Sequence, residues 1–322
     1  MAAAPLPTLA ELEAAAVIIG RTFAPTPQQR WPLLDERTGA ALWVKHENHT
    51  PVGAFKIRGG LVYLHELAAS GHRPAGIVTA TRGNHGQSIG FAAARHGIPA
   101  CVVVPRGNSP EKNVAMRALG VELVERGDDF QAAAEAADAI ATERGWYRLP
   151  SFHPWLVRGV GTWALELFRA APALDALYVP IGLGSGLCGA LAARDALGMT
   201  TEIIGVTSSH ARAYALSLRS GCVESHPATT KIADGVACRT PVPDALETMR
   251  GRIARVVEVS DDEVAAAMRA IFRDTHNVAE GAGAAALAAI MAEREVVRGR
   301  TIGMVLCGGN VDSDVFAKVL SA

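Results

Sequence analysis

The fold of this chain is decided by the stretch Ala176-Leu177-Tyr178-Val179-Pro180-Ile181-Gly182-Leu183-Gly184-Ser185-Gly186. Its apolar first half predicts a short buried strand, and its glycines predict a tight loop before a helix over residues 187–197. Backbone N–H groups converge where a glycine loop enters a helix N-terminus, so this geometry favours an anion. For the loop alone, a tight turn that binds nothing is the alternative.

A small phosphate fits this loop better than a dinucleotide. The glycines at 182, 184, 186 and 189 do not follow the G-x-G-x-x-G spacing. The next predicted strand, residues 202–207, ends in Val206-Thr207 and has no acidic residue there to hold a ribose. We therefore expect the loop to hold a single phosphate group.

Short apolar segments alternate with helical patterns along most of the chain, which predicts right-handed crossovers and parallel sheets. We predict an α/β fold of two lobes, each a mostly parallel sheet flanked by helices, with a large domain of residues 1–73 and 149–322 and a small mobile domain of residues 74–148. A capping box, Thr8-Leu-Ala-Glu11, opens the first helix, and residues 22–45 suggest loop and short strands. The predicted strands are 41–45, 76–80, 100–105, 121–124, 176–180, 202–207 and 301–306. The predicted helices are 8–19, 56–70, 87–96, 110–119, 130–144, 156–170, 187–197, 261–274 and 281–293.

The composition excludes several classes of protein. Of the 322 residues, 49% are hydrophobic and 20% are charged, which is too apolar for a disordered chain. The formal net charge of -1 gives no basic surface for nucleic acid or an anionic membrane. A small molecule is the expected partner.

The N-terminus has neither the basic region nor the apolar run of a secretory signal, and no window reaches the length of a membrane span. We expect a cytoplasmic protein with no membrane partner. The five cysteines form no closely spaced pair, so neither a zinc site nor a disulfide framework is predicted.

A single lysine stands among glycines in Thr50-Pro51-Val52-Gly53-Ala54-Phe55-Lys56-Ile57-Arg58-Gly59-Gly60. The stretch leads into a predicted helix N-terminus, where Lys56 can reach a bound ligand. A solvent-exposed lysine at a helix start is the alternative when this window is taken alone.

Two further polar loops follow predicted strands. The first, Thr79-Ala80-Thr81-Arg82-Gly83-Asn84-His85-Gly86-Gln87, can present amides and short side chains to a carboxylate, or it can be a locally satisfied helix cap. The second, Cys307-Gly308-Gly309-Asn310, lies at the carboxyl edge of a sheet, where open α/β sheets bind ligands. A cysteine there can face a ring nitrogen, or it can be a small buried hydrophobe.

Taken in order, the motifs resemble the pyridoxal-phosphate enzymes of the tryptophan synthase β-subunit type, and most of all their serine/threonine dehydratase group. The resemblance spans about residues 15–315. It is carried by Pro51-x-Gly53-x-Phe55-Lys56-x-Arg58-Gly59, Gly83-Asn84-His85-Gly86-Gln87, the glycine loop after Val179-Pro180, Ile232-Ala233-Asp234-Gly235, Glu280-Gly281-x-Gly283-Ala284-Ala285 and Gly308-Gly309-Asn310-Val311-Asp312.

The resemblance implies pyridoxal phosphate in the cleft between the lobes, joined covalently to Lys56. Phe55 would flank the cofactor ring, Asn84 would hydrogen-bond its hydroxyl, and Cys307 would face its nitrogen. The phosphate would be held by Gly182, Leu183, Gly184, Ser185, Gly186 and Leu187. The substrate would be bound by Thr81, Arg82, Gly83, Asn84 and His85.

The chain also departs from the family pattern. Racemases of the group have serine at the position of Arg82, and arginine, with a pKa above about 12, is a poor proton shuttle. The stretch after Val206 has no carboxylate, so we expect no metal site of the kind several relatives have. Leu183 and Ser185 replace glycines of the phosphate loop. The chain ends soon after Asp312, so we expect no C-terminal regulatory domain and no feedback inhibition by isoleucine.

The resemblance implies a dehydratase, or ammonia-lyase, that converts a β-hydroxy α-amino acid to a 2-oxo acid and ammonia by β-elimination. L-Threonine and L-serine are the first candidates, and phenylserine and hydroxyaspartate are the bulkier or acidic alternatives. An amino-acid racemase, a β-replacement synthase and a non-enzymatic binding protein are further alternatives. The family expectation for assembly is a homodimer.

Overall fold

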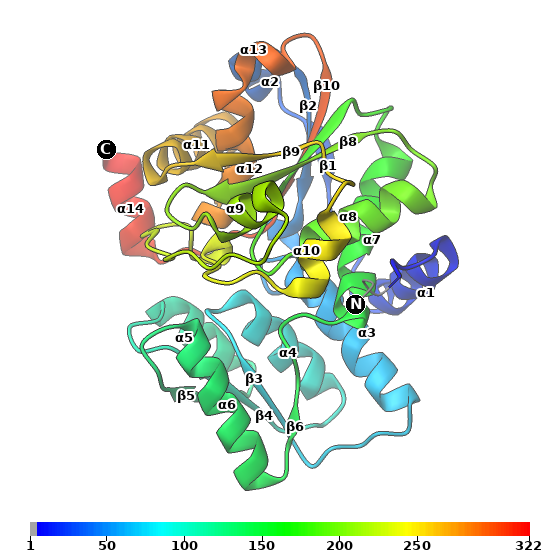
Figure 1. Cartoon of the computed structure of the whole chain (residues 1–322), viewed down its shortest axis with the longest axis vertical. Coiled ribbons are helices and arrows are strands. Elements are labelled where there is room, and N and C mark those ends of the chain that lie inside the picture. The colour runs from blue at the N-terminus through cyan, green and yellow to red at the C-terminus, as the bar shows by residue number, and fades with distance from the viewer. Residues whose placement is uncertain (1–4) are drawn as a thin grey trace.

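The computed structural model describes residues 5–322. They form two lobes, each built on one β-sheet, and one lobe lies above the other in Figure 1. The six-stranded sheet has the order β1-β2-β10-β7-β8-β9, and the four-stranded sheet has the order β5-β4-β3-β6. The six-stranded sheet with the helices packed on it is the large lobe, and the four-stranded sheet with its helices is the small lobe. The strands are β1 Gln28–Arg30, β2 Ala41–His46, β3 Ile77–Ala80, β4 Ala100–Val104, β5 Glu122–Glu125, β6 Tyr147–Arg148, β7 Ala176–Pro180, β8 Glu202–Ser208, β9 Arg255–Val259 and β10 Thr301–Leu306.

Every strand pairing except β1 with β2 is parallel, as the alternation of strands and helices predicts. The α/β fold with two parallel-dominated sheets is thus confirmed. The helices are α1 Leu9–Gly20, α2 Pro32–Thr38, α3 Lys56–Ala69, α4 Asn84–Arg95, α5 Pro110–Ala118, α6 Phe130–Arg144, α7 Pro154–Ala170, α8 Ser185–Ala196, α9 Ala213–Ser220, α10 Pro243–Met249, α11 Asp261–Thr275, α12 Gly281–Ala292, α13 Arg294–Val297 and α14 Ser313–Ser321. Two 3-10 turns are η1 Glu47–His49 and η2 Asp234–Val236.

The prediction of loop and short strands for residues 22–45 is wrong where α2 forms. Pro32 at the first helical position and Gly39 in a left-handed conformation bound this helix, as is common at the two ends of a helix. Its seven residues are too few to show a hydrophobic periodicity that would predict a helix. β1 is one of the short strands predicted within residues 22–45. The sequence does not predict β6, β9, α9, α10, α13 and α14, because most of them are short or half-exposed at the edges of the fold.

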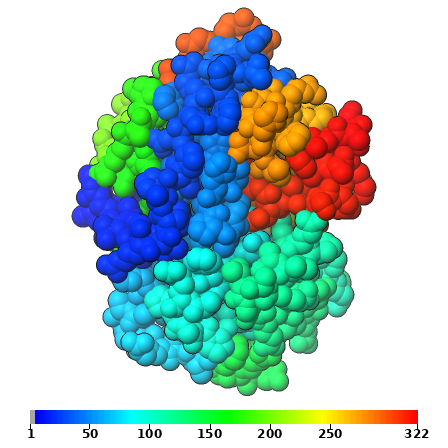
Figure 2. All heavy atoms as spheres, turned by 180° about the vertical axis from the view of Figure 1, so that it is seen from behind, coloured from blue at the N-terminus to red at the C-terminus, as the bar shows by residue number. Residues whose placement is uncertain are grey.

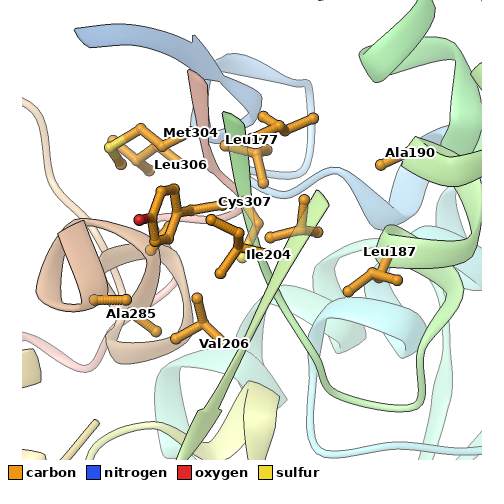
Figure 3. Close-up of a cluster of buried hydrophobic side chains, with 14 of the residues drawn as sticks. Leu177, Leu187, Ala190, Ile204, Val206, Ala285, Met304, Leu306 and Cys307 are labelled. Atoms are coloured by element: carbon orange, nitrogen blue, oxygen red, sulfur yellow. The ribbon is translucent and has the colours of Figure 1, made fainter. Parts of the chain in front are cut away.

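Apolar side chains of the large-lobe core cover both faces of its sheet (Figure 3). Ala285 of α12 packs on one side of the strands, and Leu187 and Ala190 of α8 pack on the other. Strands that are buried on both faces are apolar throughout, as parallel sheets require. β10 ends at Leu306, so Cys307 follows the strand directly and lies at the carboxyl edge of the sheet.

A second apolar cluster joins the two lobes through α1, α3, α4 and α7. Ile57 and Leu64 of α3 pack there with Ile89 of α4 and Leu156 of α7. Seen from behind, the segment from about residue 75 to residue 145 forms the lower block of the molecule (Figure 2). The strands of the small lobe lie within 77–148, and the division at residues 73 and 149 stays a prediction. No helix in the described chain has both the length and the apolarity needed to cross a membrane.

Candidate active site

The N-termini of several helices, among them α3, α4, α8 and α12, converge on one cavity of about 380 Å³ between the lobes. Helices α3, α4, α8 and α12 begin at Lys56, Asn84, Ser185 and Gly281, and a residue from the start of each helix lines the cavity. Free N–H groups and the positive ends of the helix dipoles therefore surround it. This arrangement favours a ligand with more than one anionic group.

The cavity brings together nearly all of the predicted site residues. Those that line it are Phe55, Lys56, Thr81, Arg82, Gly83, Asn84, His85, Gly182, Leu183, Gly184, Ser185, Gly186 and Cys307. Leu187 is the exception, because its fully buried side chain belongs to the core below the loop (Figure 3). Only its backbone N–H is left for the predicted contact with a phosphate.

Lys56 is the first residue of α3 and points its amine at the start of α8. Its Nζ atom lies 3.4 Å from Oγ of Ser185 and 5.2 Å from the centre of the Phe55 ring. Burial lowers the pKa of Lys56 to about 8, because a desolvated site disfavours the charged form. A substantial fraction of this amine is therefore neutral and nucleophilic in mildly alkaline solution.

The glycine loop leaves the N-terminus of α8 open. Gly184, the N-cap residue, has φ +99°, and no side chain caps the helix. A Cβ atom at Gly184 would lie 2.7 Å from Cβ of Ala245, so only glycine fits this turn. The N–H groups of the first helical turn have no intrahelical acceptor. They are a cradle of the size and polarity that a phosphate group requires.

Cys307 and Asn84 line the same cavity as Lys56. The N–H of Phe55 donates to the carbonyl of Cys307 over 3.0 Å, which holds the cysteine beside the lysine loop. Burial raises the pKa of the Cys307 thiol, so it is neutral. The Asn84 amide donates to Oε1 of Glu280 over 2.6 Å and accepts from Asn310 over 2.9 Å. An amine, an anion cradle and a neutral thiol together suit pyridoxal phosphate.

The loop before α4 is arranged for a carboxylate. Oγ1 of Thr81 accepts from the N–H groups of Gly83 and Gly86, over 2.9 and 3.3 Å. The N-cap residue Gly83 has no side chain, so the N–H groups of Asn84 and His85 in the first turn are left without a side-chain acceptor in the described chain. Nε2 of His85 lies 3.1 Å from Oγ1 of Thr79, and burial lowers the pKa of His85 to about 3. The imidazole is therefore neutral and adds no charge to this subsite.

A cluster of charged side chains around Lys112 bridges the two lobes, and the sequence does not predict it. Nζ of Lys112, from α5, lies 2.7 Å from Oδ2 of Asp234 and 3.1 Å from Oε2 of Glu280. Burial alone would lower the pKa of Lys112, but the two carboxylates outweigh it and raise that pKa. Gly83 packs on the lysine stem, where a Cβ atom would lie 2.4 Å from Cδ of Lys112. Asp234 and Glu280 stand in motifs of the resemblance, whereas no local pattern marks Lys112.

A second ion pair lies on the wall of the cavity. Nη1 of Arg239 is 2.6 Å from Oδ2 of Asp129, the N-cap residue of α6. Arg82 also lines the cavity, and its buried Nε atom has no hydrogen-bond partner among residues 5–322. Neither Arg239 nor Asp129 stands in a recognisable motif.

No group of three or more His, Cys, Asp or Glu side chains that could hold a metal ion occurs within residues 5–322. In the stretch that follows Val206, Arg212 forms an ion pair with Glu258 of β9. The Glu258 carboxylate is thus already paired with a cation.

Comparison with known proteins gives concordant matches. The family described as pyridoxal-phosphate dependent enzyme matches residues 19–308. L-Threonine ammonia-lyase of Thermotoga maritima is 32% identical over 290 residues, which are 90% of this chain and 72% of that protein. The crystal structure of a threonine deaminase from T.th. has a TM-score of 0.87 and 33% identity over 95% of this chain and 99% of that one. A pyridoxal 5'-phosphate-dependent aspartate racemase has a TM-score of 0.89 and 27% identity over 97% and 98% of the two chains.

Proposed function

Because this chain belongs to the family of pyridoxal-phosphate dependent enzymes, we propose that it is an ammonia-lyase for a β-hydroxy α-amino acid, with L-threonine or L-serine as the first substrates. The observation that carries the proposal is Lys56, a buried amine with its pKa lowered to about 8, beside the open N-terminus of α8. The relatives named threonine ammonia-lyase and threonine deaminase support the reaction class.

Each group of the cavity has one task in this reaction. When bound, pyridoxal phosphate supplies an electron-withdrawing ring that makes the substrate Cα proton acidic. The N-terminus of α8 holds the phosphate, and the N-terminus of α4 with Thr81 holds the substrate α-carboxylate. The Lys56 amine, neutral in part near pH 8, accepts the Cα proton.

The net reaction is balanced without any further reactant. The Cα proton and the β-hydroxyl leave as water, and a water molecule then hydrolyses the carbon–nitrogen bond. L-Threonine would give 2-oxobutanoate and ammonium, and L-serine would give pyruvate and ammonium. A neutral thiol at Cys307 would leave the ring nitrogen of a bound cofactor unprotonated, which suits elimination.

Racemisation is the second candidate, because an aspartate racemase shares the fold over nearly the whole chain. It requires a second proton donor on the face of the substrate opposite Lys56. Arg82 occupies the position at which racemases of the group have serine, and a guanidinium does not give up its proton near neutral pH. Elimination is therefore favoured over racemisation.

The test uses the purified protein with added pyridoxal phosphate. We expect a visible absorption band and the release of 2-oxo acid and ammonia from L-threonine or L-serine. Chiral analysis of the recovered substrate should find no accumulating D-isomer. A coloured protein that releases no 2-oxo acid from a panel of β-hydroxy amino acids, including phenylserine, would contradict the proposal.

Two further expectations stay predictions. The family resemblance favours a homodimer, and light scattering of the purified holoenzyme measures its mass directly. A cytoplasmic location is the second expectation, and fractionation of the source cells checks it.

A further inference from the structure

The charges that line the cavity leave one guanidinium without a partner. The cationic side chains there belong to Lys56, Arg82, Lys112 and Arg239, and the acidic ones to Asp129, Asp234 and Glu280. All three carboxylates are already paired, with Lys112 or with Arg239. Among the described residues that line the cavity, no carboxylate is left for Arg82.

Arg82 is held against the site rather than extended into solvent. The residue is half-buried, and its Nε atom is fully buried with no hydrogen-bond partner in the described chain. A buried N–H of a charged group that lacks an acceptor is costly. Arg82 lines the cavity, so an anion on a bound ligand can pair with its guanidinium, and a carboxylate matches the planar guanidinium with two parallel hydrogen bonds.

The cavity already has separate places for the other two anions. The open N-terminus of α8 suits the cofactor phosphate, and the open N-terminus of α4 with Thr81 suits the α-carboxylate of an amino acid. Arg82 lies next to the second of these, between Thr81 and Gly83. It is thus placed to meet a third anion, on the substrate side chain.

We propose that Arg82 is a specificity-determining residue that binds a side-chain carboxylate, so that the enzyme accepts a β-hydroxy α-amino dicarboxylic acid such as 3-hydroxyaspartate. The inference rests on the proposed ammonia-lyase function and names a substrate class for the same site. Loss of the Cα proton and the β-hydroxyl as water, followed by hydrolysis, would convert 3-hydroxyaspartate to oxaloacetate and ammonium.

The kinetic test compares 3-hydroxyaspartate, as its threo and erythro forms, with L-threonine. In the holoenzyme, Arg82→Gln should lower kcat/KM for the hydroxyaspartate isomer that reacts by about ten- to hundredfold, the range for a hydrogen bond to a charged group. L-Threonine has no second carboxylate, so its kcat/KM should change less than about threefold. Arg95→Gln, at the exposed C-terminal end of α4, removes the same charge and should leave both values unchanged.

A binding measurement tests the same point without turnover. L-Malate has two carboxylates and no amino group, so it binds the holoenzyme without reacting, and 2-hydroxybutanoate lacks the second carboxylate. In a calorimetric titration, Arg82→Gln should raise Kd for malate by at least about tenfold and leave Kd for 2-hydroxybutanoate unchanged.

Several outcomes would overturn the proposal. If Arg82→Gln lowers kcat/KM equally for 3-hydroxyaspartate and L-threonine, Arg82 binds the α-carboxylate that both share. If it lowers kcat/KM for neither, Arg82 does not bind the substrate. If the wild-type enzyme releases no 2-oxo acid from any substrate, the proposed function fails. Malate binding that depends on Arg82 would still support the carboxylate site, and malate binding that is indifferent to Arg82 would reject it.

Discussion

Nζ of Lys112 lies 2.7 Å from Oδ2 of Asp234, and this ion pair joins α5 of the small lobe to η2 of the large lobe. The lysine side chain is only 7% exposed and also lies 3.1 Å from Oε2 of Glu280. Asp312, the N-cap residue of α14, accepts from Oγ of Ser109, the N-cap residue of α5, over 2.6 Å. Polar contacts from two elements of the large lobe thus hold α5 at the mouth of the cleft.

Lys112→Met should destabilise the protein and open the cleft. The substitution leaves two carboxylates near each other without a cation, and breaking one partner of a buried pair typically costs several kcal/mol. Since Asp234 is partly exposed, we expect a loss of about 2–3 kcal/mol in the free energy of unfolding, measured by urea titration.

Two further variants make this test specific. Glu280→Gln in the Lys112→Met background removes one unpaired charge and should restore part of the stability, which a double-mutant cycle measures. Arg106→Met breaks a pair whose members are 62% and 86% exposed, and it should cost less than about 1 kcal/mol. Equal effects of Lys112→Met and Arg106→Met would show that the interlobe cluster contributes no special stability.

Lys56→Ala should abolish both the visible band of the covalently bound cofactor and the release of ammonia. The described chain offers no second amine at this position, because the other cavity lysine is engaged by two carboxylates. We expect the specific activity to fall by at least about 10³-fold, as for loss of a nucleophile that also acts as base. Lys231→Ala, at an exposed position, is the matched control and should keep band and activity.

Particular elements show which parts of the fold and of the site the sequence predicts. The helix over 130–144 and the strands over 176–180 and 301–306 form with the predicted bounds, because their apolar patterns are regular. The glycine loop was recognisable because the glycines follow a strand directly. Lys112, Asp129 and Arg239 could not be found, since each acts through a partner more than 100 residues away, and no local pattern encodes such a pairing.

The rate at which the apo-enzyme takes up pyridoxal phosphate should rise with pH through about 8 and level off above it. Only the neutral amine of Lys56 attacks the cofactor aldehyde, and burial lowers its pKa to about 8. With the ordinary lysine pKa near 10.4, the rate would instead keep rising to about pH 10. Stopped-flow absorbance of the apo-enzyme mixed with cofactor distinguishes the two midpoints.

The lowered pKa of Lys56 also predicts how the stability of the apo-enzyme changes with pH. Since the folded pKa of Lys56 lies below the unfolded one, the unfolded chain binds more protons between about pH 8 and 10.4. The contribution of Lys56 to stability therefore rises with pH across that window. Lys56→Met removes this contribution, so the difference in unfolding free energy between variant and wild type should shrink from pH 7 to pH 10. A constant difference would contradict the lowered pKa.

Gly184→Ala should weaken cofactor binding more than it weakens the fold. Gly184 has φ +99°, and a Cβ atom there would lie 2.7 Å from Cβ of Ala245 and 2.8 Å from Cε of Met249. The loop must shift to relieve this contact, which moves the N–H groups at the start of α8 away from the phosphate. We expect Kd for pyridoxal phosphate, from absorbance titration, to rise by about tenfold or more, the equivalent of one lost charge-assisted hydrogen bond.

Gly198→Ala provides the matched control for the backbone. Gly198 also has a positive φ, +64°, but a Cβ atom there would meet nothing within 4 Å. Both variants therefore carry the strain of a left-handed alanine, of order 1 kcal/mol, while only Gly184→Ala adds the clash at the phosphate loop. If the two variants raise Kd equally, the α8 N-terminus does not hold the phosphate, and the assignment of the glycine loop fails with it.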